Sequence, residues 1–201
     1  MNNQLIAATT NSGKIIEIQS LLHRLNLKIT SLNDLDNPPL IIEDADTFEG
    51  NAIKKAVIIS DTFKAAVLSD DSGLCVDALN GRPGVFSARY GGAGLNDSDR
   101  CQLLLKEMMT VPESQRGASF KCVAAFKVPG KSVVTFNGAV HGTIAMTPSG
   151  TNGFGYDPLF IPDGSQKTMA QLELHEKQKI SHRAAALKLF VRWLSNNTDS
   201  Y

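Results

Sequence analysis

The stretch with the most chemical character is the acidic run Ser69-Asp70-Asp71-Ser72-Gly73-Leu74, which follows the apolar residues 65–68. The apolar residues predict a buried strand, so two adjacent carboxylates stand where that strand is expected to end. Neighbouring carboxylates repel each other unless a cation or a proton lies nearby. The run therefore indicates a hard-metal site, a general base, or both. A solvated turn is the alternative, because Asp, Ser and Gly all favour turns.

A second candidate is the segment Thr9-Thr10-Asn11-Ser12-Gly13-Lys14, between a predicted strand and a predicted helix. A helix N-terminus presents free backbone N–H groups and a partial positive charge, and both suit phosphate. Lys14 would add a full charge in the first turn. The segment lacks the second glycine of a Walker A motif, and an ordinary polar loop is the alternative.

Two later segments add cations and an aromatic loop. Lys177, Lys179, His182 and Arg183 surround the start of the last predicted helix. Cations at a helix start are unfavourable unless an anion binds there, although a solvated basic face would carry the same residues. Residues 153–158, Gly-Phe-Gly-Tyr-Asp-Pro, would bring an aromatic ring and backbone against a flat base, or would form a tight turn with Phe in the core.

Composition sets the frame for these segments. A chain of 201 residues with 42% hydrophobic residues can bury a real core. Lys plus Arg and Asp plus Glu both number 20, which argues against a sequence-independent nucleic-acid partner. No stretch approaches the ~18 apolar residues of a membrane span. Three scattered cysteines and a start without a signal-peptide pattern predict a cytoplasmic protein.

Strand and helix patterns alternate along the chain. Strands are expected at residues 5–9, 27–30 and 65–68, with an extended piece at 40–42 and an antiparallel hairpin of residues 118–128 and 132–140. Helices are expected at residues 15–25, from 46 to about 59, at 97–109 and at 181–194, and a Gly-rich loop at 148–163. This order predicts one α/β domain over residues 1–201 with a mixed sheet.

Together the segments supply two cationic phosphate sites, a carboxylate pair for Mg²⁺ and an aromatic loop for a base, which is the inventory of a nucleoside triphosphate site. At these same residues the chain resembles the non-canonical purine nucleoside triphosphate pyrophosphatases, also called inosine triphosphate pyrophosphatases or XTP/dITP diphosphatases. The resemblance runs nearly end to end. It is carried by residues 8–14, 70–74, 77–90, 153–158 and 180–183.

The resemblance implies Mg²⁺-dependent hydrolysis of ITP, dITP and XTP to the monophosphate and pyrophosphate, which keeps deaminated purines out of nucleic acids. It implies an elongated mixed β-sheet flanked by helices, with two lobes around a central cleft, and a homodimer. The expected partner is therefore a purine nucleoside triphosphate, with neither a nucleic acid nor a membrane.

The resemblance also assigns roles by position. Asp71 is expected to act as general base, and Glu43 and Asp71 to hold Mg²⁺. The role of Asp70, metal ligand or structural support, stays open. The expected substrate contacts are Thr9, Thr10, Asn11, Ser12, Gly13, Lys14 and Lys55 at the phosphates, Ser72, Phe154, Gly155, Tyr156 and Asp157, and Lys177, His182 and Arg183 at the base edge and a neighbouring phosphate.

Base choice is expected to depend on the 6-position of the purine. Inosine and xanthine carry an oxo group there, whereas adenine carries an amine. A pocket of donors from Lys177, His182 and Arg183 would favour the oxo group. Guanine is also a 6-oxo base, so its rejection requires another element.

One segment departs from the family pattern, which commonly has Glu-Asn-Ala after a Thr-Phe pair. Here the run is Thr47-Phe48-Glu49-Gly50-Asn51-Ala52, so Gly50 replaces an acid. Asp46 and Glu49 have the spacing of a capping box and are expected to start the helix. Loss of the acid would weaken Mg²⁺ binding if that side chain shapes the metal site.

Two other functions fit the same residues. A Maf-like nucleotide pyrophosphatase would share the general fold but prefer pyrimidine or modified nucleotides. A nucleotide sensor would bind without turnover. The segment 153–158 and the pair His182-Arg183 count against the first, and the acids Glu43, Asp70 and Asp71 count against the second.

Overall fold

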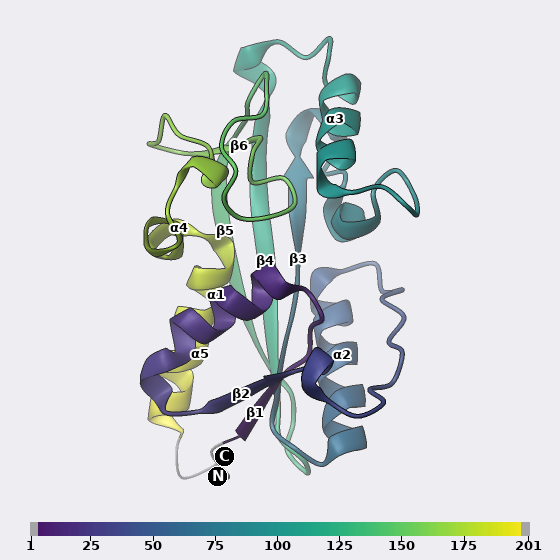
Figure 1. The fold of residues 1–201 in the computed structure, drawn as a ribbon, viewed down its shortest axis with the longest axis vertical. Coiled ribbons are helices and arrows are strands. Elements are labelled where there is room, and N and C mark those ends of the chain that lie inside the picture. The colour runs from purple at the N-terminus through teal and green to yellow at the C-terminus, as the bar shows by residue number, and fades with distance from the viewer. Residues whose placement is uncertain (1–3, 198–201) are drawn as a thin grey trace. The chain divides into compact units, whose positions relative to one another are not determined.

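The fold is known from a computed structural model that describes residues 4–197 and contains one six-stranded sheet (Figure 1). The strand order is β2-β1-β3-β4-β5-β6. The strands are β1 (Gln4–Ala7), β2 (Lys28–Ser31), β3 (Val67–Val76), β4 (Gly117–Lys127), β5 (Val134–Ile144) and β6 (Phe160–Pro162). Because β1 pairs in parallel with β2 and β3 while β5 pairs antiparallel with β6, the predicted mixed sheet is confirmed.

Five α-helices are assigned within the described residues. They are α1 (Ser12–Leu22), α2 (Phe48–Phe63), α3 (Asp97–Glu107), α4 (Leu174–Ile180) and α5 (His182–Asn196). Short 3₁₀ turns lie at His23–Leu25, Leu32–Asp34, Asp77–Leu79, Gly84–Arg89, Glu113–Gln115 and Met169–Gln171. None of the helices between residues 4 and 197 has the length and apolar character needed to cross a bilayer.

The chain divides into two compact units. The first unit comprises Met1–Asp71, Cys122–Gly138 and Arg183–Tyr201, and the second comprises Ser72–Lys121 and Ala139–His182. Strands β3, β4 and β5 each contribute residues to both units. The predicted lobes around a cleft, and the single domain, stay predictions.

The first unit has three layers. Leu5, Ala7 and Leu68 belong to a core cluster that contains side chains of α1 and α5, whereas Ile6 and Val67 belong to a cluster that contains side chains of α2. Successive side chains of a strand point to opposite faces. The sheet is therefore covered by α1 and α5 on one face and by α2 on the other, which explains the apolar character of residues 65–68 (Figure 1).

The second unit has its own core beneath α3. Tyr156 and Phe160 are buried there, and the Phe160 ring lies 4.7 Å from that of Phe120. Arg116 is also fully buried, and its guanidinium donates to four carbonyl oxygens. Two of them, those of Met108 and Val111, follow α3, and the other two, of residues 144 and 145, stand at the end of β5. This arginine joins the end of α3 to the sheet through backbone carbonyl oxygens.

The acidic run is the main difference from the predicted elements. β3 does not end at Leu68 but continues through Asp70 and Asp71 to Val76, so the run is strand and the turn interpretation is wrong. The strand β6 interrupts the loop expected at residues 148–163, and the helix α4 lies where no element was predicted. Residues 40–42 form no strand. The other predicted strands and helices are confirmed within a few residues at their ends.

The start of α2 also differs. Thr47, rather than Asp46, is the N-cap, and its side chain accepts the backbone N–H of Gly50 at 3.0 Å. Glu49 accepts from the hydroxyl of Thr135 at 2.8 Å and closes no capping box with Asp46. The cap therefore uses the residue next to the helix, as the usual bond from N-cap side chain to N3 backbone requires.

Candidate active site

Asp70 and Asp71 are neighbours in sequence but belong to opposite faces of the sheet. Strand residues alternate in direction, and Leu68 faces α1 and α5 while Val67 faces α2. By that alternation Asp70 faces α1 and α5, and Asp71 faces α2. The strand thus delivers two buried carboxylates to two different sets of hydrogen-bond and ion-pair partners.

Asp70 is enclosed by cations. The carboxylate oxygen Oδ2 lies 3.0 Å from Lys14 Nζ, and it accepts from Arg183 Nε at 3.2 Å and from Arg183 Nη2 at 3.0 Å. A further guanidinium nitrogen of Arg183 donates to Glu17 of α1. All of these side chains except Lys14 are at least 95% buried. Asp70, Arg183 and Glu17 therefore form a buried ionic network between α1, β3 and α5.

The charges around Asp70 determine its ionisation. Burial alone would raise the pKa of this carboxyl, but the positive charges of Arg183, Lys14 and Lys55 outweigh burial and hold the pKa far below its usual range. Asp70 is accordingly a permanent anion whose charge is already compensated. Such a carboxylate is a poor proton acceptor, which argues against Asp70 as the general base; the choice between metal ligand and structural support stays a prediction.

This depressed pKa predicts acid sensitivity. A carboxyl whose folded pKa lies below the unfolded value stabilises the fold above that value, near 3.8, and the stabilisation is lost as the pH falls toward the folded pKa. Asp71 has the opposite sign, because its folded pKa is raised. Urea denaturation of wild type and Asp70→Asn should therefore show that wild type loses more unfolding free energy between about pH 4 and about pH 2. Equal losses in the two proteins would contradict this assignment.

Asp71 has a different environment on the α2 face. Its Oδ2 accepts the side-chain amide of Asn51 at 3.0 Å. Lys55 of α2 donates to the carbonyl oxygen of Asp70 at 2.7 Å and to the carboxylate of Glu43. Asn51, Lys55 and Asp71 are all buried, and Glu43 is partly exposed. Two acids, one lysine and one amide thus gather beside α2 within the first unit.

The pKa of Asp71 is raised. Burial is the largest cause, the charges of Lys55 and Lys14 and the bond from Asn51 act against it, and the nearby charge of Glu43 raises it further. A carboxylate with a raised pKa binds a proton more firmly than a free aspartate does. Asp71 therefore has the property that a general base needs, whereas Asp70 lacks it.

The acids beside α2 also fit a hard metal ion. Carboxylate oxygens are the preferred ligands of Mg²⁺, and a cation would relieve the repulsion that Glu43 exerts on Asp71. Among residues 4–197, no group of three or more His, Cys, Asp or Glu side chains gathers for a metal. Mg²⁺ commonly binds one or two carboxylates and completes its shell with water and substrate phosphates, so two acids suffice.

The predicted phosphate segment connects β1 to α1. Asn11 is the N-cap of α1, and its side chain accepts the N–H of Lys14 at 3.0 Å. Thr9 accepts the N–H of Asn11 at 3.2 Å, and Asn33 donates to the carbonyl oxygen of Thr10 at 3.1 Å. These bonds shape the loop, and Thr10, Asn11 and Ser12 are exposed. Ser12 and Gly13 open the helix, so the loop has the position and exposure that an anion site requires.

The aromatic loop belongs to the second unit. Asp157 is buried, and its Oδ2 accepts the N–H of Phe154 at 3.0 Å and lies 2.5 Å from Lys177 Nζ. The same ammonium lies 4.8 Å from the centre of the Phe154 ring. A side chain on Gly153 would place its Cβ 2.0 Å from Asp157, and the residue has a φ of +77°. The loop thus requires glycine at this position and is organised by one buried ion pair.

Two aromatic residues of the second unit have roles in packing. Tyr156 is buried in the core and donates through its hydroxyl to the carbonyl oxygen of Ser87 at 3.1 Å, so a substrate contact there would use its backbone. His182 is buried, and its ring stacks on Phe120 with centroids 4.8 Å apart and an interplanar angle of 11°.

Two further predicted substrate contacts also lie in the second unit. Gly155 donates its N–H to Asp97 at 2.6 Å. Ser72, in β3, also belongs to this unit.

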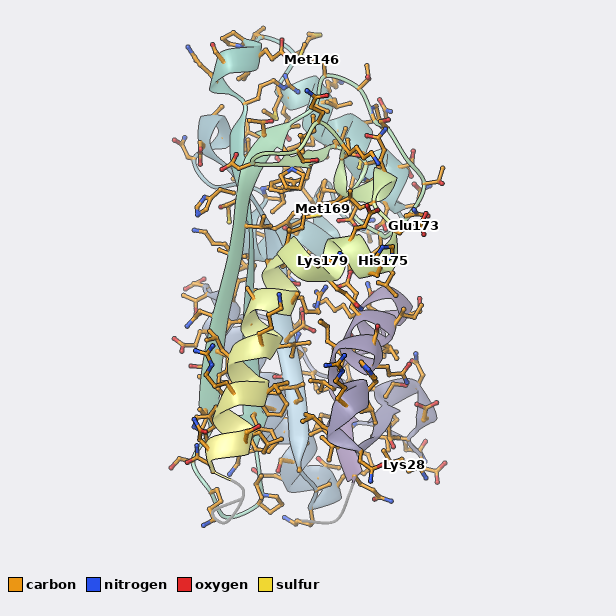
Figure 2. All side chains as sticks on the ribbon, turned by 90° about the vertical axis from the view of Figure 1, so that its left-hand side faces the viewer. Lys28, Met146, Met169, Glu173, His175 and Lys179 are labelled. Atoms are coloured by element: carbon orange, nitrogen blue, oxygen red, sulfur yellow. The ribbon has the colours of Figure 1, made fainter. Side chains whose placement is uncertain are left out.

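The basic cluster expected around the start of the last helix, α5, is divided. Lys177 of α4 is buried against Asp157, whereas Lys179 is exposed on the same helix, where Figure 2 also shows His175. His182 packs in the second unit, and Arg183 belongs to the ionic network of the first. The roles expected for these residues toward substrate stay predictions.

Glu17 is the residue of the ionic network that sequence reasoning did not find. It lies one turn before Leu21 on the inward side of α1, and it is buried together with Ile18 and Leu22. An acid within an apolar helical stripe is a signal, because a buried carboxylate needs a cation. The partner Arg183 lies 166 positions further along the chain, so spacing could not identify it.

The fold and these side chains define a class: an α/β protein whose central strand carries carboxylates, beside lysines of the neighbouring helices, of the kind that phosphate chemistry uses. Comparison with known proteins identifies the family. The Ham1 family model matches residues 5–193, and the chain belongs to this family. The resemblance inferred from the motifs is thereby confirmed.

Named relatives agree in function and in length. The dITP/XTP pyrophosphatase of Geobacter sulfurreducens is 46% identical over 186 residues, which cover 92% of this chain and 94% of the relative. The dITP/XTP pyrophosphatase of Bacillus subtilis is 44% identical over 191 residues, with 95% and 96% covered. The solved structure of the Staphylococcus aureus Ham1 protein superposes with a TM-score of 0.86 at 36% identity, covering 96% of this chain and 99% of that one.

Proposed function

We propose that this protein hydrolyses deaminated purine nucleoside triphosphates, namely dITP, XTP and ITP, to the monophosphate and pyrophosphate with Mg²⁺. The observation that carries the proposal is Asp71, a buried carboxylate with a raised pKa that lies beside Lys55, Asn51 and Glu43. The curated relatives that match over more than nine-tenths of both chains are named dITP/XTP pyrophosphatases, which supports the same reaction.

Asp71 activates the water in this mechanism. Its carboxylate orients a water molecule toward the α-phosphorus and takes up the proton as the new P–O bond forms and the bond to pyrophosphate breaks. The bond from Asn51 engages one carboxylate oxygen and fixes the plane of the group. General-base assistance of this kind contributes about 10²- to 10⁴-fold to the rate.

Cations compensate the charge on the phosphates. Lys14 and Lys55 would interact with the triphosphate, and the N-terminus of α1 would donate backbone N–H groups to it. Mg²⁺, held by Glu43 and Asp71, would supply further positive charge for the leaving pyrophosphate. Lys14 lies against Asp70 and Lys55 against Glu43, so both ammonium groups are held in place by carboxylates.

The base would be recognised by the second unit. Phe154 offers a ring, and Lys177 is fixed by Asp157 with its ammonium over that ring. A donor at this place favours the 6-oxo group of hypoxanthine and xanthine over the 6-amino group of adenine.

We also propose that the protein is a homodimer in the cytoplasm. The three unbridged cysteines support a reducing compartment.

Pyrophosphate release from a panel of nucleotides tests the proposal. Purified protein is incubated with Mg²⁺ and dITP, XTP, ITP, GTP, ATP, dTTP or UTP. Fast release from dITP, XTP and ITP is expected. Release confined to dTTP or UTP would instead favour a Maf-like enzyme, and binding without release would favour a sensor. Equal rates with ATP and ITP would contradict the 6-oxo selectivity. Light scattering of the same sample measures the oligomeric state.

Lys14→Ala is expected to weaken both substrate binding and turnover. The phosphates are charged in the ground state, so loss of the ammonium raises KM, and further negative charge builds up on the leaving pyrophosphate in the transition state, so kcat falls as well. A hydrogen bond to a charged group is worth about 1.5–3 kcal/mol, so kcat/KM for dITP should fall about 10- to 100-fold. Lys54→Ala is the matched control, because Lys54 is a partly exposed lysine of α2 that pairs with Asp44. Equal kinetics in the two variants would remove Lys14 from the site.

A further inference from the structure

Asn51 is a polar side chain with no exposed surface in the second turn of α2. Its Oδ1 accepts the backbone N–H of Ala45 at 3.0 Å. Its Nδ2 donates to Asp71 Oδ2 at 3.0 Å and faces the carbonyl oxygen of Ala45 at 3.4 Å. One buried amide therefore joins the segment that precedes α2 to the central strand β3.

The orientation of this amide is fixed by its neighbours. The N–H of Ala45 can only donate and must meet the amide oxygen, whereas the carboxylate of Asp71 accepts and must meet the NH₂ group. Turning the amide by half a rotation would place donor against donor and acceptor against acceptor. Asn51 can therefore bind both partners in only one orientation of its amide, which holds the two partners at a fixed separation.

Gly50 strengthens this connection by its lack of a side chain. A Cβ on Gly50 would lie 2.8 Å from the Cβ of Ala45 and 3.1 Å from the hydroxyl oxygen of Thr47. The segment before α2 is thus packed directly on the first turn of the helix, where Thr47 also caps the N–H of Gly50. The glycine that departs from the family pattern is explained by this close approach.

The segment held in this way carries Glu43, two residues before Ala45. Glu43 and Asp71 come from different parts of the chain, and Lys55 joins the Glu43 carboxylate to the backbone of β3. The amide of Asn51 adds a second connection, because it bonds to Asp71 directly and to the backbone near Glu43. We propose that Asn51 is a positioning residue that sets the placement of Glu43 relative to Asp71 for a divalent cation, an inference that rests on the proposed function.

Direct metal binding tests this role without the reaction. Mn²⁺, used as a paramagnetic probe for the Mg²⁺ site, is titrated into nucleotide-free wild type, Asn51→Ala and Gly50→Ala, and the free ion is measured by electron paramagnetic resonance. Loss of a side chain that orients a metal ligand typically costs about 10- to 100-fold in metal affinity. Asn51→Ala should raise the Kd for Mn²⁺ by that factor. Gly50→Ala, which keeps the amide but displaces Ala45, should raise it in the same direction.

Ser60→Ala is the matched control for packing. Ser60 is buried on the same helix and donates to the carbonyl oxygen of Ala65 at 2.9 Å, far along α2 from Asn51. It should lose stability without a change in the Kd for Mn²⁺. If Asn51→Ala does not fold, Gly50→Ala carries the test, since alanine is the better helix former. Mn²⁺ affinity in Gly50→Ala and Asn51→Ala equal to that of Ser60→Ala would overturn the inference.

Kinetics separate this inference from the proposed function. With dITP at saturating Mg²⁺, Asn51→Ala should show a kcat about 10- to 100-fold lower and a KM within about threefold of wild type. An inactive wild type would refute the proposed function, while the Mn²⁺ titrations would still test the positioning role. An active wild type with unchanged Mn²⁺ affinity in the variants would refute only the positioning role. A wild type that binds no Mn²⁺ would also overturn it.

Discussion

Asp71→Asn is expected to lower kcat for dITP by about 10²- to 10⁴-fold, the contribution of a general base. Asparagine has the same shape, and its amide oxygen can still accept the hydrogen bond that Asn51 now donates to Asp71 at 3.0 Å. The variant therefore keeps the local structure but cannot take up the proton of the attacking water. Initial rates of pyrophosphate release and equilibrium binding of dITP measure the two properties separately.

Asp61→Asn is the matched control for Asp71→Asn. Asp61→Asn changes the same group on an exposed position of α2 and should behave as wild type. Asp71→Asn should still bind dITP, because Lys14 and Lys55 remain. A kcat close to the wild-type value would exclude Asp71 as the base.

Asp70→Ala is expected to lower the unfolding free energy by about 3–5 kcal/mol, as loss of one partner from a buried ion pair generally does. Arg183 is 1% exposed, and the variant would remove its ion pair with Asp70 and that of Lys14, while the pair of Arg183 with Glu17 stays. The network between α1, β3 and α5 would then contain uncompensated positive charge. Chemical denaturation at neutral pH measures the change.

Asp44→Ala serves as the control for Asp70→Ala. Asp44 also pairs with a lysine, Lys54 at 2.6 Å, but this pair is largely exposed to solvent and should contribute little. Each variant removes an aspartate carboxylate from an ion pair, in one case a buried pair and in the other an exposed pair. If they lower the unfolding free energy equally, the buried network does not stabilise the fold as described.

Much of the fold could be predicted from periodicity. The helices α1, α2, α3 and α5 have apolar stripes. The strand β1 and the first residues of β3 are apolar on both faces because helices cover both faces of the sheet there. β6 and α4 were missed, since a strand of 3 residues and a helix of 7 are too short to show a period.

The acidic run shows where local patterns fail. Two aspartates and a glycine have low strand propensity, so the sequence favoured a turn. The structure keeps them in β3 because each acid finds partners across the fold, Arg183 for Asp70 and Asn51 for Asp71. Contacts with residues 113 and 20 positions away in the sequence override the local preference for a turn. Once the strand is known, the period of two separates the acids without further information.

The residue types of the candidate site were predicted, but the interaction partners of these residues were not. Lys14 and Lys55 are the predicted phosphate contacts and Asp71 is the predicted base, and the structure places all three around β3 in the first unit. The pairing of Arg183 with Glu17 and the burial of Tyr156 had no signal in spacing. Such roles depend on which side chains fill the core, and one sequence does not specify that.

The central claim is that a water activated by Asp71 attacks the α-phosphorus of a deaminated purine triphosphate. Hydrolysis of dITP in ¹⁸O-labelled water, followed by mass spectrometry of the products, tests it most directly. The account predicts dIMP that carries the label in its phosphate and unlabelled pyrophosphate. Production of dIDP and inorganic phosphate, or of labelled pyrophosphate with unlabelled dIMP, would contradict it.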